Sequence, residues 1–182
     1  MTTTSTTAAG PRHSLVTMPG VIALLVALIS TALLAGTYYA YATSVMLAFH
    51  RLDDKTFVEV FNKINVVIVN PIFMLSFLGS VVFSIVAALF FFRADYRPIL
   101  LWILAAVVLN ILSLAISGIF NIPLNNHLAT ADTATGPIDY AGLRHDFETP
   151  WVAWNVVRGL VNTAAVGVLG WALVQYGRIT AS

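Results

Sequence analysis

The sequence predicts an all-α integral membrane protein, a four-helix bundle whose helices run up-down-up-down. Of its 182 residues, 59% are hydrophobic and only 9% are charged, and the mean hydropathy is +0.87. An ordinary soluble domain carries about 25% charged residues. Four apolar stretches, residues 21–42, 66–92, 99–120 and 151–176, are each long enough to cross about 30 Å of hydrocarbon as a helix. Four crossings place both termini on one side of the membrane.

The segment before the first span has a different composition. Residues 1–19 are rich in Thr, Ala and Pro and have little to bury, so we predict a disordered tail. Residues 20–178 then form a single four-span membrane domain. The first apolar stretch exceeds a signal-peptide core and has no clear cleavage site after it, so we expect a retained helix.

An amphipathic helical segment is predicted to lead into the second span. Asp53 can cap the free amides of a helix start, and Leu52 and Phe57 have the spacing of a hydrophobic staple. The apolar pattern then continues to Asn70 and Pro71. Because proline removes a backbone hydrogen bond, we expect a kink there.

The long connection between the third and fourth spans, residues 121–150, divides into two parts. Its first half contains the run Thr-Ala-Asp-Thr-Ala-Thr-Gly-Pro, which is typical of disorder. Its second half, Arg144 to Glu148, is charged and is the better candidate for a lid.

The positive-inside rule gives a tie by number, with four Lys or Arg residues on each side of the predicted membrane. The very short loop that contains Arg93 and Arg97 favours the terminal side as the inside. We therefore expect a multi-pass protein of the cell membrane with cytoplasmic termini.

Arg158 is the most informative residue, because its charged side chain lies two turns inside the fourth span. A guanidinium stays protonated and is costly at membrane depth, so such an arginine normally faces a polar cavity or a partner. The structural alternative is that Arg158 reaches toward the interface or pairs with Asp146 or Glu148. It lies about 10 Å below Trp151 along the helix, at the depth expected for a cavity floor.

Polar side chains form narrow stripes on three of the predicted spans, and their cost in hydrocarbon predicts that the stripes face inward. The fourth span carries Trp151, Asn155, Arg158 and Asn162 within about 60°, the third carries Asn110, Ser113, Ser117 and Asn121 within about 80°, and the first carries Ser30, Thr37, Tyr41 and Ser44. Such Ser and Asn residues also serve as plain interhelical hydrogen-bond partners, and the tyrosines and tryptophans as an interfacial belt.

The topology brings the polar ends of the spans to one membrane face, where we predict one cavity. Its predicted lining is Tyr41, Ser44, Asn65, Asn70, Asn121, Asn125, Trp151, Trp154, Asn155 and Arg158.

Five segments of the chain together are similar to a known family. They are residues 36–46 (Gly-Thr-Tyr-Tyr-Ala-Tyr-Ala-Thr-Ser-Val-Met), Phe61 to Asn65, Asn70 to Phe73, Asn121 to Asn125, and Trp151 to Arg158. In this order and placement they resemble the anthrone oxygenase-like family of four-span membrane proteins. The resemblance covers nearly everything from Gly36 to Arg158.

The resemblance implies oxidation of an aromatic, enolisable polyketide-like substrate by molecular oxygen, without a metal or another cofactor. Arg158, Asn155, Asn121 and Asn125 would then stabilise a developing oxyanion. Trp151 and Trp154 would stack on the flat substrate, and Tyr41, Asn65 and Asn70 would complete its binding site. The general base is not evident, and His127, which closely follows Asn125 in the sequence, is the first candidate.

The sequence argues against several other classes of function and leaves two alternatives open. The chain has no basic cluster or motif for nucleic acid, no cysteine, and no histidine pair with metal-ligand spacing. Its expected partners are membrane lipid, the aromatic substrate and oxygen, and no oligomeric state is predicted. The alternatives are a membrane protein that binds a quinone or lipid-like molecule without chemistry, and a scaffold subunit that packs through small residues of the fourth span such as Gly159 and Gly167.

Overall fold

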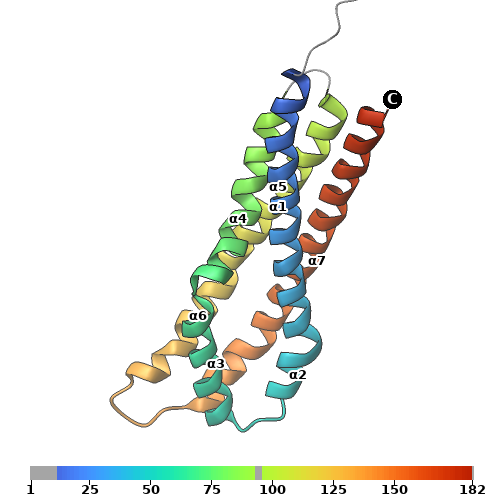
Figure 1. The fold of residues 1–182 in the computed structure, drawn as a ribbon. Coiled ribbons are helices and arrows are strands. Elements are labelled where there is room, and N and C mark those ends of the chain that lie inside the picture. Colours follow the sequence, from blue (N-terminus) through green and yellow to red (C-terminus); the bar gives the residue numbers. More distant parts are fainter. Residues whose placement is uncertain (1–11, 93–95, 182) are drawn as a thin grey trace, which may run out of the picture.

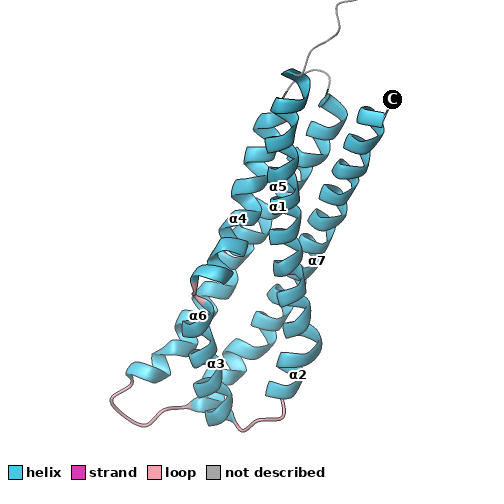
Figure 2. Cartoon of the chain, viewed as in Figure 1, coloured by secondary structure: helices cyan, strands magenta, loops and turns pink. Residues whose placement is uncertain are grey.

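A computed structural model describes residues 12–92 and 96–181, which are helical apart from short loops (Figures 1 and 2). Within these ranges, four helical segments are long and apolar enough to cross a membrane. The first segment is α1 (Arg12–Ala40), continued by η1 (Tyr41–Val45) and α2 (Met46–Phe49), and the second is α4 (Pro71–Phe90). The third is α5 (Arg97–Ile116), continued by η3 (Ser117–Asn121), α6 (Ile122–Leu128) and η4 (Ala129–Thr133). The fourth is α7 (Tyr140–Ala181). This confirms the predicted all-α membrane bundle with four long apolar helices.

The four long segments lie side by side, and the described start of α1 and the end of α7 lie at the same end of the bundle (Figure 1). In the half near this end, α1 packs on α4 and α7, while α5 packs on α7 and α4. The core there contains many small side chains, including Ala23, Ala27, Ala87, Ala106 and Ala172. Small residues let helix backbones approach closely. The resulting van der Waals contacts hold the helices together in lipid, where there is no hydrophobic driving force between them.

The first helix begins earlier than the sequence indicated. Residues 12–19 were assigned to the tail, whereas α1 begins at Arg12; the rest of the predicted tail, residues 1–11, lies outside the described residues, as does Arg93. The apolar span itself begins at Met18. Thr and Ser do not prevent a helix from extending beyond an apolar span once that span has nucleated it.

The amphipathic helix before the second span is present as α3 (Asp54–Ile68). The side chain of Asp53 accepts a hydrogen bond from the Thr56 amide at 3.0 Å, as a helix cap does. The predicted kink at Asn70 and Pro71 is a complete break instead. The Asn70 side chain caps α4 by accepting from the amides of Ile72 and Phe73, and Pro71 occupies the first turn, where its missing N–H costs nothing.

The connection between the third and fourth spans is more helical than predicted. The helix after Asn121 continues through η4, and α7 begins at Tyr140, within the stretch that the sequence indicated as a lid. At 1.5 Å per residue its 42 residues measure about 63 Å, roughly twice the hydrocarbon thickness. The charged turns of α7 can therefore lie beyond the membrane, where charge does not oppose a helix.

Two π-helical turns interrupt the long helices at the end opposite the termini. They are η1 in the first segment and η3 in the third. A π turn accommodates an extra residue and therefore shifts the phase of everything after it. Ser44, which the 100° phase placed in the first polar stripe, lies within η1 and is exposed, whereas the complete stripes of the third and fourth spans are buried as predicted.

Candidate functional site

A cavity of about 300 Å³ lies between the helices at the end of the bundle that holds α3. One side of its lining is polar and comes from η3, α6 and α7, while the other is apolar and comes from α3 and α4. The full lining is Thr37, Tyr38, Tyr41, Phe61, Asn65, Ile68, Val69, Phe73, Met74, Phe77, Ser117, Asn121, Ile122, Asn125, Trp151, Asn155 and Arg158.

Arg158 projects from α7 into this lining and is only 7% exposed. Its terminal nitrogens donate to the Ser117 hydroxyl at 3.1 Å and to the Asn155 carbonyl oxygen at 3.2 Å. The guanidinium also lies over the ring of Tyr38, with its carbon 4.3 Å from the ring centroid, a distance typical of a cation–π contact. All these partners are neutral.

The structural alternative, an ion pair with Asp146 or Glu148, does not occur. Glu148 binds Arg144 at 2.7 Å and His50 at 2.9 Å, and Asp146 lies beside His145. In residues 12–92 and 96–181, no ion pair includes Arg158. The charge is therefore stabilised by dipoles and a π face, and it remains available to an anionic or carbonyl oxygen.

Amide side chains fix the walls of the cavity. Asn155 donates to the backbone carbonyl of Tyr38 at 2.9 Å, in the turn before η1. Asn121 donates to the backbone carbonyl of Trp151 at 3.2 Å, and the indole N–H of Trp151 donates to Asn125 at 2.8 Å. These bonds join α1, η3 and α6 to α7, so the same residues that line the cavity also hold its shape.

Some polar atoms in the lining are buried but lack a hydrogen-bond partner among the described residues. They are the Tyr38 hydroxyl, Asn65 Nδ2, Asn121 Oδ1 and Arg158 Nε. A buried polar group normally has a partner, because leaving it unpaired costs about 1–3 kcal/mol. These two donors, one acceptor and one hydroxyl are therefore the unsatisfied polar groups of the lining.

The structure brings most of the predicted site residues together. Tyr41, Asn65, Asn121, Asn125, Trp151, Asn155 and Arg158 all line the cavity. Three others lie elsewhere. Asn70 caps α4, Trp154 stacks on Phe120 with centroids 3.6 Å apart, and His127 lies with Trp154 in a separate surface groove.

Sequence reasoning missed the apolar wall of the cavity, which includes Phe73, Met74 and Phe77 of α4. In an apolar span, such residues have no signal that distinguishes a cavity wall from a lipid-facing surface. Tyr38 was not among the residues predicted to line the cavity, but its ring lies against Arg158. Its position three residues before Tyr41, on the same helix face, was the available signal.

The chemistry of the lining is rich in donors and poor in bases. Its titratable side chains, within the described part of the chain, are Tyr38, Tyr41 and Arg158, and none is an imidazole or a carboxylate. No group of three or more His, Cys, Asp or Glu side chains gathers in the described ranges to hold a metal ion. An aromatic cavity with a guanidinium and amides at one wall suits a flat apolar molecule that carries an oxygen at one edge.

The remaining polar stripes serve the bundle rather than the cavity. The Asn110 amide donates to Thr31, to Ser84 and to the carbonyl of Ser80, and Asn162 donates to the Ser113 hydroxyl. These bonds join neighbouring helices, and neither Asn110 nor Asn162 lines the cavity. They match the alternative that such residues are interhelical hydrogen-bond partners.

Comparison with known proteins agrees with this geometry. The model of a protein family described as anthrone oxygenase matches residues 73–168, just over half of the chain. No curated protein and no solved structure matches. The matched region contains α4, α5, η3, α6 and most of α7, and with them Asn121, Asn155 and Arg158. This multi-pass membrane protein belongs to the anthrone oxygenase family.

Proposed function

We propose that the chain oxidises an aromatic, enolisable substrate with molecular oxygen in the cavity beside Arg158. The observation that carries this proposal is the buried guanidinium, whose Nε has no partner and which no carboxylate neutralises. Such a group stabilises an oxygen on which negative charge develops during a reaction. The family supplies the reaction type.

For a simple anthrone, the proposed oxidation consumes one O₂ and releases one water. The ring CH₂ opposite the ketone loses a proton, and the resulting enolate carries its charge on the oxygen. Its carbon gives electrons to O₂ and forms a C–O bond, which yields a hydroperoxide after protonation. Loss of water from the hydroperoxide breaks the O–O bond and leaves the quinone. One oxygen atom enters the product and the other leaves as water.

The residues of the cavity would act mainly on the enolate oxygen. Arg158 would donate to it through Nε, while Ser117 and Asn155 hold the guanidinium in place. Trp151, whose ring lies 5.6 Å from that of Tyr41, would contact the flat face of the substrate. Because the described lining has no imidazole or carboxylate, the protein would lower the energy of the enolate and the proton would pass to water. His127 has no part in this proposal.

The proposal extends to location and partners. The substrate and oxygen both dissolve in hydrocarbon, so a membrane cavity can receive them from the bilayer. We place the protein in the cell membrane with its termini in the cytoplasm, where the start of α5 and the last turn of α7 carry Arg97 and Arg178.

The test is oxygen uptake and quinone absorbance with purified protein in lipid nanodiscs, given a simple anthrone. The wild-type chain is compared with Arg158→Gln and with Arg178→Gln, a matched control that removes an exposed arginine from the same helix. We expect turnover above the spontaneous rate in the wild type and in Arg178→Gln, and only the spontaneous rate in Arg158→Gln. Equal rates in all three samples would overturn the proposal.

A second candidate function is binding of a quinone or lipid-like molecule without turnover. The lack of a base in the described lining favours it, because binding requires donors but no proton acceptor. In the same experiment this function would appear as quinone binding that Arg158→Gln weakens, with no enzymatic oxygen uptake in any sample.

A further inference from the structure

The cavity has a neighbour on its apolar side. A shallow groove on the outer surface is lined by Tyr41, Val60, Lys63, Ile64, Val67, Ile68 and Asn70. Tyr41 and Ile68 line both the groove and the cavity. Both side chains are half-exposed, so they form the partition between the two spaces.

The arrangement of the helices leaves this side of the cavity thinly covered. The helix α3 packs mainly against α6 and α7, and it makes few contacts with α1. The chain then breaks between Ile68 and Pro71, where α3 ends and α4 begins. Side chains rather than a continuous helix therefore separate the cavity from the surface at this point.

The surface around the groove is strongly apolar. Val66, Val67, Val69 and Ile72 are 67% to 80% exposed. A contiguous run of exposed aliphatic side chains in a membrane protein marks a surface that contacts lipid. The groove is mainly aliphatic, with Lys63 and Asn70 as its polar lining residues, so it offers an apolar path out of the cavity.

The polarity of the cavity gives a bound molecule one orientation. Arg158, Asn155 and Asn121 lie on the wall formed by α7 and η3, whereas Phe73, Met74 and Ile68 lie on the wall next to the groove. An oxygen-bearing ring edge would face the first wall. Its opposite edge would then face Ile68 and Tyr41, and an apolar substituent on that edge would extend into the groove.

We infer that the ligand of this site is an aromatic head with an apolar chain, the head in the cavity and the chain in the groove between η1 and α3. This inference rests on the proposed function only for the position of the head. Val60, Ile64 and Val67 supply the aliphatic surface for the chain. Burial of each CH₂ group contributes about 0.8 kcal/mol relative to water, although a chain already dissolved in lipid gains much less.

The experiment measures binding to nanodiscs by the quenching of tryptophan fluorescence, with two probes: menadione, and a naphthoquinone of the same head that carries an isoprenoid chain. Concentrations are expressed per lipid, and empty nanodiscs correct for partition. Ile68→Trp fills the junction of groove and cavity, and Val66→Trp adds the same bulk to the exposed face of the same helix. Because both variants add a tryptophan, they are compared with each other as well as with the wild type.

We expect the wild type and Val66→Trp to bind the chain-bearing probe more tightly than menadione. In Ile68→Trp, the affinity for the chain-bearing probe should fall about tenfold and further than the affinity for menadione, whose remaining binding shows that the variant is folded. Ile68→Ala should keep binding both probes.

Equal affinities for the two probes in the wild type, or equal losses in Ile68→Trp, would overturn the inference and leave the proposed function standing. A wild-type protein that binds the chain-bearing probe but turns over no anthrone would contradict the proposed function and leave this inference standing. If neither probe binds the wild type, both are wrong. Chain binding that Arg158→Gln does not weaken would show a bilayer lipid in the groove rather than the chain of the ligand.

Discussion

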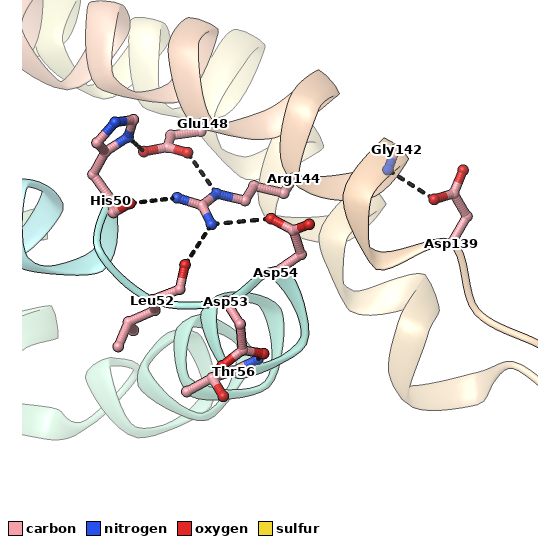
Figure 3. A network of polar contacts seen from close by, with 9 residues as sticks. All are labelled: His50, Leu52, Asp53, Asp54, Thr56, Asp139, Gly142, Arg144 and Glu148. Atoms are coloured by element: carbon pink, nitrogen blue, oxygen red, sulfur yellow. Dashed lines mark hydrogen bonds and ion pairs between the residues drawn. The ribbon is translucent and has the colours of Figure 1, made fainter.

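Two arginines on α7 have opposite environments, although they lie about 21 Å apart along the helix and only about 40° apart around it. Arg144 has a partner on every guanidinium nitrogen: Glu148 on Nε, Asp54 and the Leu52 carbonyl on one terminal nitrogen, and the His50 carbonyl on the other (Figure 3). Arg158 has neutral partners on two nitrogens and none on the third.

The difference separates an arginine that is bonded within the fold from one with an unpaired nitrogen, on which the proposed function rests. Arg144 neutralises two carboxylates and ties the loop before α3 to α7, while its guanidinium lies 4.6 Å from the ring centroid of Phe57. Four of its five N–H groups are used in these bonds. Arg158 retains its charge, and its Nε has no partner at the wall of a cavity, an arrangement that costs stability unless a ligand uses it. Incomplete satisfaction, rather than burial, is therefore the mark of the site.

The largest expected effect comes from Arg158→Lys, which keeps the charge but removes the planar fork and Nε. An ammonium cannot contact Ser117, Asn155 and a ligand with the same geometry. We expect oxidation of an anthrone to fall about 100-fold, as it does when one oxyanion donor is lost, with little change in melting temperature. The rate is measured by oxygen uptake, and Arg178→Lys is the control. Full activity in Arg158→Lys would reduce the role of Arg158 to its charge.

The reverse pattern is expected for Arg144→Gln. The substitution leaves Glu148 and Asp54 without their cation and frees the carbonyls of Leu52 and His50. We expect the free energy of unfolding to fall by about 2 kcal/mol, measured by thermal or denaturant unfolding in detergent. Affinity for menadione should stay within twofold of the wild type, about 0.4 kcal/mol. A loss of affinity without a loss of stability would break the contrast between the two arginines.

A smaller effect is expected for Trp151, which lies on α7 between Arg144 and Arg158. Trp151→Phe keeps an aromatic ring beside Tyr41 and Phe61 but loses the hydrogen bond to Asn125. The net loss of one neutral hydrogen bond is about 1 kcal/mol, so quinone affinity should fall about fivefold. The matched control is Trp154→Phe, because Trp154 lies outside the cavity, and it should bind as the wild type does. An equal loss of quinone affinity in both variants would show that Trp151 has no specific role in the cavity.

The smallest effect concerns pH at the Arg144 end. Hydrogen bonds from Thr56 lower the pKa of the Asp53 carboxyl below its ordinary value. The folded protein therefore binds this proton less tightly than the unfolded chain does. The stabilisation is complete above about pH 4 and is lost as the pH falls through the lowered pKa. The melting temperature of the wild type should exceed that of Asp53→Ala at pH 6, and the gap should narrow below about pH 4. A gap that stays constant down to pH 3 would show that charge plays no part in this cap.

Much of the site was predictable because polar residues have few places to go in a membrane helix. Asn155 and Asn121 were identified from helical phase alone, and they are buried in the lining. The prediction was wrong where a local hydrogen bond holds a side chain away from the cavity. Asn70 was predicted to line the cavity from its position near the second span, but its carbonyl oxygen caps α4.

The loop residues were less predictable. His127 follows Asn125 by only two positions, yet α6 turns it to a separate groove with Asp146. Two residues that are close in the sequence face the same cavity only if the helix between them keeps a regular phase. The π turn η3 shifts the helical phase just before α6. Ser44, which lies within the other π turn, η1, was likewise predicted to line the cavity but is exposed.

The sequence alone determined the membrane bundle, the inward polar stripes of the third and fourth spans and the burial of Arg158, because hydrocarbon penalises every unpaired polar group and leaves few arrangements. Only the tertiary structure decided which arginine is satisfied and which is not. Arg144 and Arg158 are both arginines on one helix, and their difference depends on partners far away in the chain, such as His50 for Arg144 and Tyr38 for Arg158. It also decided that α3 leaves the junction at Tyr41 and Ile68 thinly covered, since such a gap results from how helices pack and not from any residue by itself.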